Sequence, residues 1–173
     1  IQESDQLFNG LFADVDLYSN RLGTGDQKQS ATIAEVIKVL EGADLIHAKG
    51  DVLGNAYEYL IGQFASETGK KAGEFYTPHE VSLLMSEIVA SHLHGKNEIK
   101  IYDPTSGSGS LLINIGHSAA KYMSDANNIK YYAQELKEST YNLTRMNLVM
   151  RGIKPDNIVT RNGDTCLLYT SPS

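Results

Sequence analysis

The sequence predicts an α/β fold, namely the first half of a parallel, doubly wound sheet preceded by a helical N-terminal region. From about residue 96, short alternating apolar segments are separated by longer helix-like ones. A strand–helix–strand–helix–strand order is typical of a parallel sheet with helical crossovers. Before residue 73, apolar residues recur every three or four positions, as on one face of a helix.

The N-terminal region, residues 1–72, is expected to hold two helices. The first is predicted over "SATIAEVIKVLEGA" (30–43), with Ser30 as a plausible N-cap. Its apolar face would carry Ile33, Val36, Ile37 and Leu40. The second is predicted over "DVLGNAYEYLIGQFASETG" (51–69), where Gly69 is a stop signal. Its apolar face would carry Leu53, Tyr57, Leu60, Ile61 and Phe64.

A third helix is predicted over "HEVSLLMSEIVASHL" (79–93), after the break at "KKAGEFYTP" (70–78). Thr77 could cap this helix, and Pro78 suits its first turn. One face of the helix would carry Val81, Leu84, Met85, Ile88 and Val89.

The α/β core is expected over residues 73–165. Strands are predicted in "EIKIYDP" (98–104), "NIKYYAQE" (128–135) and "DNIVTRNGD" (156–164). The helices between them are predicted in "SLLINIGHSAAKYM" (110–123) and "STYNLTRMNLVMRG" (139–152). The tail, residues 166–173, fits neither pattern and could lie outside the native protein.

Composition excludes several classes of protein. The hydrophobic share (41%) and the charged share (21%) are those of an ordinary globular protein. No apolar run reaches the roughly 18 residues of a membrane span, and no signal peptide pattern opens the chain, so we expect a cytoplasmic protein. The single cysteine, Cys166, excludes an internal disulfide framework and a cysteine zinc cluster. The net charge of −6 argues against tight autonomous binding of nucleic acid.

The glycine-rich turn "DPTSGSGS" (103–110) follows the first predicted strand, where ligands of doubly wound folds bind. A P-loop would need a lysine, and none lies between Lys100 and Lys121. A dinucleotide fingerprint would need a third glycine where Leu112 stands, and Asp103 would lie near the pyrophosphate. The first of these readings fails, and the second is disfavoured.

S-adenosylmethionine fits the turn better, because its methionine end carries an ammonium and a sulfonium that Asp103 would attract. Glu135, at the end of the second strand, has close to the spacing expected of an acid that binds ribose hydroxyls. Asp164, after the third strand, could accept from the adenine amino group. Each acid alone could be a solvated surface residue, but three acids at three consecutive strand ends favour a binding site.

These segments resemble the N6-adenine DNA methyltransferases, and most closely the modification (methylase) subunit of type I restriction–modification systems. The resemblance covers roughly residues 30–165. Its most specific motif is "GEFYTP" (73–78), which in this family precedes the core and closes over the methionine end of the cofactor. The other matching segments are "DVLGNAYEYLIGQFA" (51–65), "YDPTSGSGSLL" (102–112), "AQELKESTYNLTRMNLVMRG" (133–152) and "NGDT" (162–165).

The resemblance implies a Rossmann-like, S-adenosylmethionine-dependent methyltransferase sheet. The residues that would line the cofactor are Glu74, Phe75, Tyr76, Thr77, Pro78, His79, Asp103, Gly107, Ser108, Gly109, Ser110, Glu135 and Asp164. In isolation, the aromatic pair of "EFYTP" could equally serve only to pack a loop onto the core. No metal site is expected.

The family activates the adenine amine with an Asn-Pro-Pro-aromatic motif after the fourth strand, and the base is flipped out of the duplex. This motif is absent from the sequence, so no catalytic residue is assigned. We therefore expect a fragment that keeps much of the cofactor site and is inactive alone. The family also implies three partners, namely DNA with its target adenine, a specificity subunit and a restriction subunit.

Two other functions stay open. One is another S-adenosylmethionine-dependent N-methyltransferase, acting on a protein glutamine amide, although "GEFYTP" and the helical lead-in favour the DNA enzyme. The other is a non-catalytic module that binds the cofactor or serves assembly.

Overall fold

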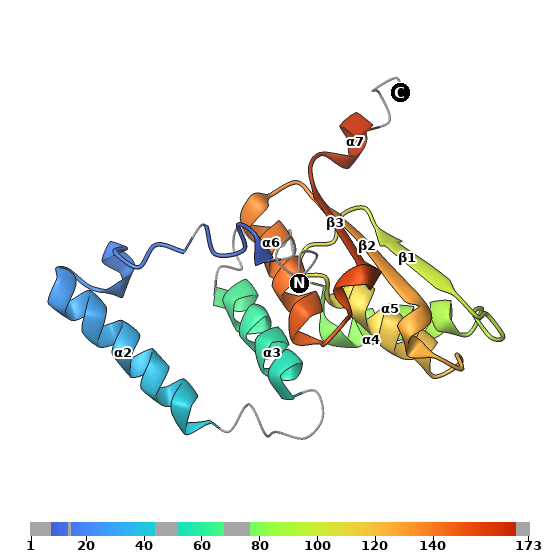
Figure 1. Ribbon diagram of the computed structural model, residues 1–173, viewed down its shortest axis with the longest axis horizontal. Coiled ribbons are helices and arrows are strands. Elements are labelled where there is room, and N and C mark those ends of the chain that lie inside the picture. The colour runs from blue at the N-terminus through green and yellow to red at the C-terminus, as the bar shows by residue number, and fades with distance from the viewer. Residues whose placement is uncertain (1–7, 14, 44–51, 68–76, 169–173) are drawn as a thin grey trace.

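The computed structural model describes residues 8–13, 15–43, 52–67 and 77–168 of the 173-residue chain (Figure 1). The helices are α2 (Asp26–Gly42), α3 (Val52–Glu67), α4 (His79–Ala90), α5 (Ser110–Ala120), α6 (Glu138–Met150) and the short α7 (Thr165–Leu168). The strands are β1 (Ile99–Asp103), β2 (Ile129–Glu135) and β3 (Ile158–Asn162). Among the described residues there are also three short 3-10 turns: η1 (Asn20–Leu22) precedes α2, η2 (Ala126–Asn128) precedes β2, and η3 (Pro155–Asn157) precedes β3.

The three strands form one parallel sheet in the order β1–β2–β3. α5 connects β1 to β2, and α6 connects β2 to β3, as the crossovers of a parallel sheet require. The register pairs Asp103 with Ala133 and Glu135 with Asn162, so the strands end at one common edge. The predicted α/β class is confirmed.

The core lies between the sheet and the helices on one of its faces. In the core, alternate residues of β1 and β2 pack against side chains of α5 and α6. The core residues are Ile99, Ile101, Leu112, Ile113, Ala119, Ile129, Tyr131, Ala133 and Leu148. Burying each of its large aliphatic side chains contributes about 1.5–3 kcal/mol. The opposite face of the sheet stays more open, and Tyr102 and Val159 are 57% and 53% exposed there.

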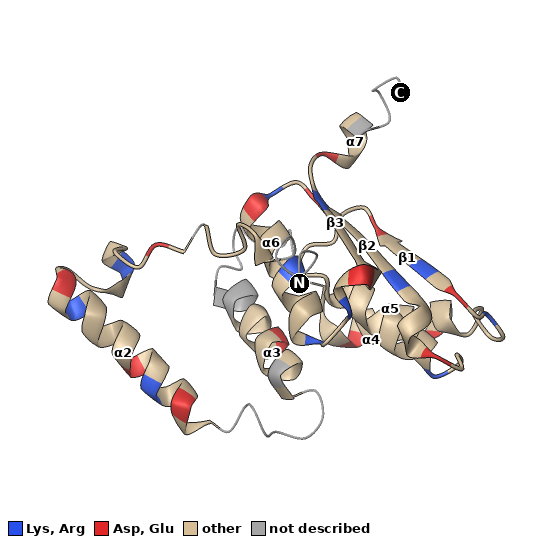
Figure 2. Ribbon diagram, viewed as in Figure 1, with Lys and Arg blue, Asp and Glu red and all other residues tan. Residues whose placement is uncertain are grey.

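The helical region divides into two parts. α3 packs against α6, whereas α2 lies apart from the sheet and contacts η1 (Figure 1). Acidic and basic residues alternate along α2 instead of forming a basic stripe (Figure 2). In the part of the chain that the structure describes, we find no helix that is both long and apolar enough to span a bilayer.

The predicted start of the first helix is wrong. α2 begins at Asp26, so Ser30 lies inside the helix, and the residue at the N-cap is Gly25. The anchor is Gln29, which is 6% exposed. Its side-chain amide donates to the carbonyls of Tyr18 (2.9 Å) and Gly23 (3.2 Å), and these bonds fix the first turn against the preceding loop.

α4 is predicted at the correct place, but the residue at its N-cap is Pro78 rather than Thr77. The apolar face is also the exposed one, with Leu84 and Ile88 64% and 56% exposed. Small residues lie on the buried face instead: Ser82, Ser86 and Ala90 are fully buried. Small side chains let α4 approach α5 closely, and the Asn114 side-chain amide donates to the Ser82 hydroxyl (2.9 Å) across that contact.

Gly116 of α5 packs tightly against Tyr131 of β2. A Cβ atom on Gly116 would lie 2.2 Å from the hydroxyl oxygen of Tyr131 and 2.6 Å from its ring. Burial raises the pKa of Tyr131 to about 12. The tyrosine ring therefore occupies the space that any side chain at this position of α5 would need.

Substituting Gly116→Ala should lower the free energy of unfolding by about 1–3 kcal/mol, the usual cost of overpacking a core. Urea or thermal unfolding measures the change. Gly42→Ala is the matched control, because nothing lies within 4 Å of a Cβ atom there and alanine favours a helix. Equal effects of the two substitutions would contradict the assigned packing.

Candidate functional site

Three acidic residues lie at or just beyond the carboxyl edge of the sheet. Asp103 ends β1, Glu135 ends β2, and Asp164 follows β3. Parallel strands in this register bring their ends together, as the sequence predicted for Asp103, Glu135 and Asp164.

The glycine loop crosses this edge and leads into α5. Gly107 and Gly109 have φ of 57° and 78°, in the left-handed region that favours glycine. Gly109 is also the N-cap of α5, and a Cβ atom on it would lie 3.2 Å from the Thr144 methyl group. The backbone N–H of Ser106 donates to the Gln134 carbonyl (2.9 Å), which continues the pairing of β1 with β2.

The side-chain carboxylate of Glu135 hydrogen-bonds the backbone of the glycine loop. One carboxylate oxygen, Oε2, accepts from the backbone N–H of Gly107 (3.0 Å), and the other accepts from that of Lys137 (3.0 Å). The side chain is therefore oriented by two backbone donors. An ionised carboxylate offers about four lone-pair positions, so both oxygens keep capacity to accept from a ligand.

Asp103 is half-buried beside this carboxylate. Burial raises its pKa, and the nearby negative charge of Glu135 raises it further. The hydrogen bond from the Thr105 backbone N–H (3.0 Å) acts in the opposite direction. The edge therefore gathers negative charge that the protein only partly compensates, and a cation placed there would be stabilised.

Asp164 has a structural contact of its own. Its Oδ1 accepts from the backbone N–H of Cys166 (2.8 Å) at the start of α7. The turn before it is tied to β2, because the Gln134 side-chain amide donates to the Gly163 carbonyl (3.2 Å).

Two residues of α6, Thr144 and Asn147, hydrogen-bond the glycine loop. Neither was predicted from the sequence. The Thr144 hydroxyl donates to the Gly107 carbonyl (2.6 Å), and it also bonds the Ser106 hydroxyl (3.0 Å). The Asn147 side-chain amide donates to the Ser108 carbonyl (3.0 Å). Both side chains are fully buried. We call Thr144 and Asn147 the loop clamp. The sequence signal that could have indicated it is a pair of polar residues three positions apart, next to the apolar Leu148.

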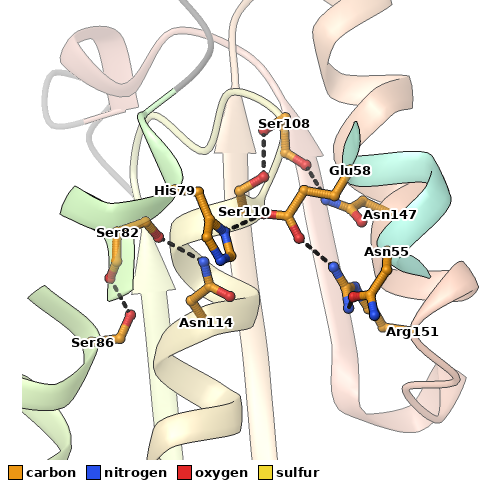
Figure 3. Close-up of polar contacts among 10 residues, drawn as sticks. All are labelled: Asn55, Glu58, His79, Ser82, Ser86, Ser108, Ser110, Asn114, Asn147 and Arg151. Atoms are coloured by element: carbon orange, nitrogen blue, oxygen red, sulfur yellow. Dashed lines mark hydrogen bonds and ion pairs between the residues drawn. The ribbon is translucent and has the colours of Figure 1, made fainter. Parts of the chain in front are cut away.

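The serines of the loop point inward. Ser108 and Ser110 are 2% and 4% exposed, and their hydroxyls lie 3.0 Å apart (Figure 3). The side chains of Ser108 and Ser110 thus lie buried at the start of α5.

The structure places only part of the "GEFYTP" segment. Thr77 is half-buried, and Pro78 and His79 are exposed at the start of α4. Glu74, Phe75 and Tyr76 lie outside the described residues. The Nδ1–H of His79 donates to Oε1 of Glu58 on α3 (3.4 Å), because a carboxylate can only accept.

Comparison with known proteins places the chain in a family. The family model described as N-6 DNA Methylase matches residues 48–172. The chain therefore belongs to the N-6 DNA Methylase family, which confirms the resemblance seen in the sequence.

Several relatives are type I restriction enzyme methylase subunits. The MpnII methylase subunit of Mycoplasma pneumoniae is 33% identical over 94% of this chain and 30% of its own length. The HindI methylase subunit of Haemophilus influenzae is 32% identical over 61% of this chain and 23% of its own length. The chain thus spans a third or less of the length of these relatives.

The fold has a close counterpart among solved structures. The type I restriction–modification system methyltransferase subunit from Streptococcus thermophilus superposes with a TM-score of 0.80 at 46% identity. The match covers 95% of this chain and 34% of that one. This similarity supports the Rossmann-like sheet expected from the sequence.

Substituting Thr144→Val removes the Thr144 half of the loop clamp with little change of shape. The Gly107 carbonyl and the Ser106 hydroxyl would lose a buried partner, so the free energy of unfolding should fall by about 1–3 kcal/mol. Amide exchange in residues 106–109 should also become faster. Thr24→Val, at an exposed position before α2, is the control and should change stability by less than about 0.5 kcal/mol. An unchanged stability of Thr144→Val would argue against the clamp.

Proposed function

We propose that this chain binds S-adenosyl-L-methionine at the carboxyl edge of its sheet. We further propose that it is the cofactor-binding part of an adenine N6-specific DNA methyltransferase, in the methylase subunit of a type I restriction–modification system. Family membership and the names of its relatives support the reaction and the assembly.

One observation carries the cofactor assignment. The carboxyl groups of Asp103 and Glu135 lie beside a glycine loop that contains no lysine. Asp103 offers negative charge to the ammonium and sulfonium groups of the ligand. Glu135, already oriented by two backbone donors, would accept from the ribose hydroxyls. A dinucleotide would instead bring its pyrophosphate to this acidic edge, which the charge of Asp103 and Glu135 opposes.

The remaining contacts follow from the resemblance. The loop residues Gly107, Ser108, Gly109 and Ser110 would place backbone groups against the amino-acid end of the cofactor. Glu74, Phe75, Tyr76, Thr77, Pro78 and His79 would close over the methionine end of the cofactor, and Asp164 would accept from the adenine amino group.

When bound, the cofactor supplies an electrophilic methyl group. The contribution of this chain would be to bind the positively charged sulfonium group and to hold its methyl group in a fixed direction for transfer. Thr144 and Asn147 fix the loop by hydrogen bonds to its carbonyl groups. A fixed loop suits that task, because in-line displacement depends on the orientation of the reacting atoms.

The acceptor adenine and the partner subunits are proposed for the whole assembly. The net charge of −6 and the mixed charge distribution give this chain little attraction for a phosphate backbone (Figure 2). By the resemblance to type I systems, target recognition would lie with a specificity subunit and cleavage with a restriction subunit, so this chain need not bind DNA well alone.

Calorimetric titration tests the cofactor assignment. S-adenosylmethionine should bind the chain, and NAD should not, because the loop offers a carboxylate where a pyrophosphate would lie. Binding of NAD in preference to the methyl donor would overturn the assignment.

Substituting Asp103→Asn should separate affinity from stability at pH 7. Loss of the charge should weaken S-adenosylmethionine binding roughly tenfold to a hundredfold, the usual value of a hydrogen bond to a charged group. Because burial raises the pKa of Asp103, its ionisation destabilises the folded chain as pH rises through that pKa. The variant should therefore be at least as stable as the unmodified chain at pH 7, and this advantage should vanish below the ordinary aspartate pKa of about 3.9.

The same linkage predicts that the affinity of the unmodified chain falls as pH drops through the Asp103 pKa, while that of Asp103→Asn stays flatter. Calorimetry across this pH range measures both curves. Parallel curves would show that Asp103 does not meet the cation.

A radiolabelled methyl-transfer assay on an adenine-containing duplex should detect no turnover by this chain alone, because its sequence contains no Asn-Pro-Pro-aromatic motif to hold the amine. A full-length methylase subunit from a related type I system, assayed with its specificity subunit, is the positive control. Turnover by the chain would show that another group activates the adenine.

A further inference from the structure

A buried arginine lies behind the candidate site, at the end of α6. The Arg151 side chain is 4% exposed, and its backbone N–H donates to the Asn147 carbonyl (3.1 Å). Its guanidinium donates to the side-chain oxygen of Asn55 (2.8 Å) and to the carboxylate of Glu58, both on α3. A buried guanidinium is stable only where it is paired, so this contact fixes α3 against the end of α6.

Glu58 extends the pairing to a third element. Its side chain is 12% exposed, and its two carboxylate oxygens have different partners. Oε2 accepts from Arg151, whereas Oε1 accepts from the His79 ring nitrogen (3.4 Å) at the first residue of α4 (Figure 3). We call Arg151, Glu58 and His79 the Glu58 bracket.

The start of α4 is thus held from two sides. The Glu58 bracket ties it to α3 and α6, and the bond from Asn114 to Ser82 ties it to α5. α5 begins where the glycine loop ends, and α6 carries the Thr144 and Asn147 clamp on the same loop. The bracket therefore joins the segment that precedes α4 to the helices that hold the glycine loop.

We propose that Glu58 and Arg151 are positioning residues for the cofactor. They act through His79, and they set the place of Thr77 and Pro78 relative to the glycine loop, although neither belongs to the carboxyl edge of the sheet. This inference rests on the proposed binding of S-adenosylmethionine.

A salt bridge that only stabilises the fold would change unfolding and leave the affinity of the folded chain unaltered. Positioning makes a different prediction. Glu58→Gln should weaken S-adenosylmethionine binding about three- to tenfold in the folded chain, because the contact with His79 loses the carboxylate charge that strengthens it.

A double-variant cycle tests whether Glu58 acts through His79. The affinity losses of Glu58→Gln and His79→Ala should not multiply, because the first removes the charge of the contact that the second removes altogether. His79→Asn should recover part of the affinity lost in His79→Ala, since its side-chain amide offers a donor near the position of Nδ1. Losses that multiply would overturn the proposal.

Asn55→Ala is the matched control. It removes another partner of Arg151 on α3 but leaves Glu58 in contact with His79. It should lower stability and keep the affinity within about twofold of the unmodified chain, the expectation for a residue outside the bracket. A loss equal to that of Glu58→Gln would mean that any loosening of α3 weakens binding, and would overturn a specific role for the bracket.

If the loss of the Glu58 charge beside Arg151 prevents folding of Glu58→Gln, the paired variant Glu58→Gln/Arg151→Met removes both charges and should show the same loss of affinity. Amide exchange gives a readout without ligand. The Ser82 N–H, which donates to the Pro78 carbonyl (3.0 Å), should exchange faster in the bracket variants than in Asn55→Ala.

The outcomes separate the two proposals. Failure of the unmodified chain to bind S-adenosylmethionine would overturn the proposed function and this inference with it. Binding by the unmodified chain with unchanged affinity in folded Glu58→Gln and in the paired variant would overturn this inference alone.

Discussion

The hydrogen bonds between α6 and the glycine loop are the interactions on which the candidate site depends. A loop with two residues at positive φ has many alternative conformations, and the fixed hydroxyl of Thr144 and amide of Asn147 select one of them. With the loop held from behind, the Gly107 N–H can point at Glu135. The clamp is built from buried polar groups, so its loss would expose unpaired carbonyls as well as free the loop.

The second constraint is electrostatic. The negative charge of Glu135 disfavours the ionisation of Asp103, and Asp103 is half-buried as well. The folded chain would be at least as stable at pH 7 with a neutral residue in place of Asp103. Retaining both is physically sensible where a cation regularly occupies the edge, because the ligand then restores the charge balance. In our account, the acidity of this edge and its glycine loop are two parts of one cofactor site.

Much of this arrangement could be predicted from the sequence. Strand periodicity and the glycine turn gave the order of elements around Asp103 and Glu135, because local pattern and chain order suffice for a parallel sheet. The burial of α4 could not be predicted in this way, since close packing of Ser82 and Ser86 on α5 reverses the usual rule that the apolar face is buried. Ser30 was wrongly expected as a cap because the long-range bonds of Gln29 determine where α2 begins. The Glu58 bracket joins residues far apart in the chain, which no local pattern indicates.

The central claim is that the methyl donor binds at the carboxyl edge of this sheet. Two-dimensional amide spectra of the isotopically labelled chain, recorded with and without S-adenosylmethionine, test it most directly. The account predicts that the resonances of Gly107, Gly109 and Glu135 shift on addition of the ligand, while those of α2 stay in place. Binding that leaves the glycine loop unchanged and shifts residues elsewhere would contradict it.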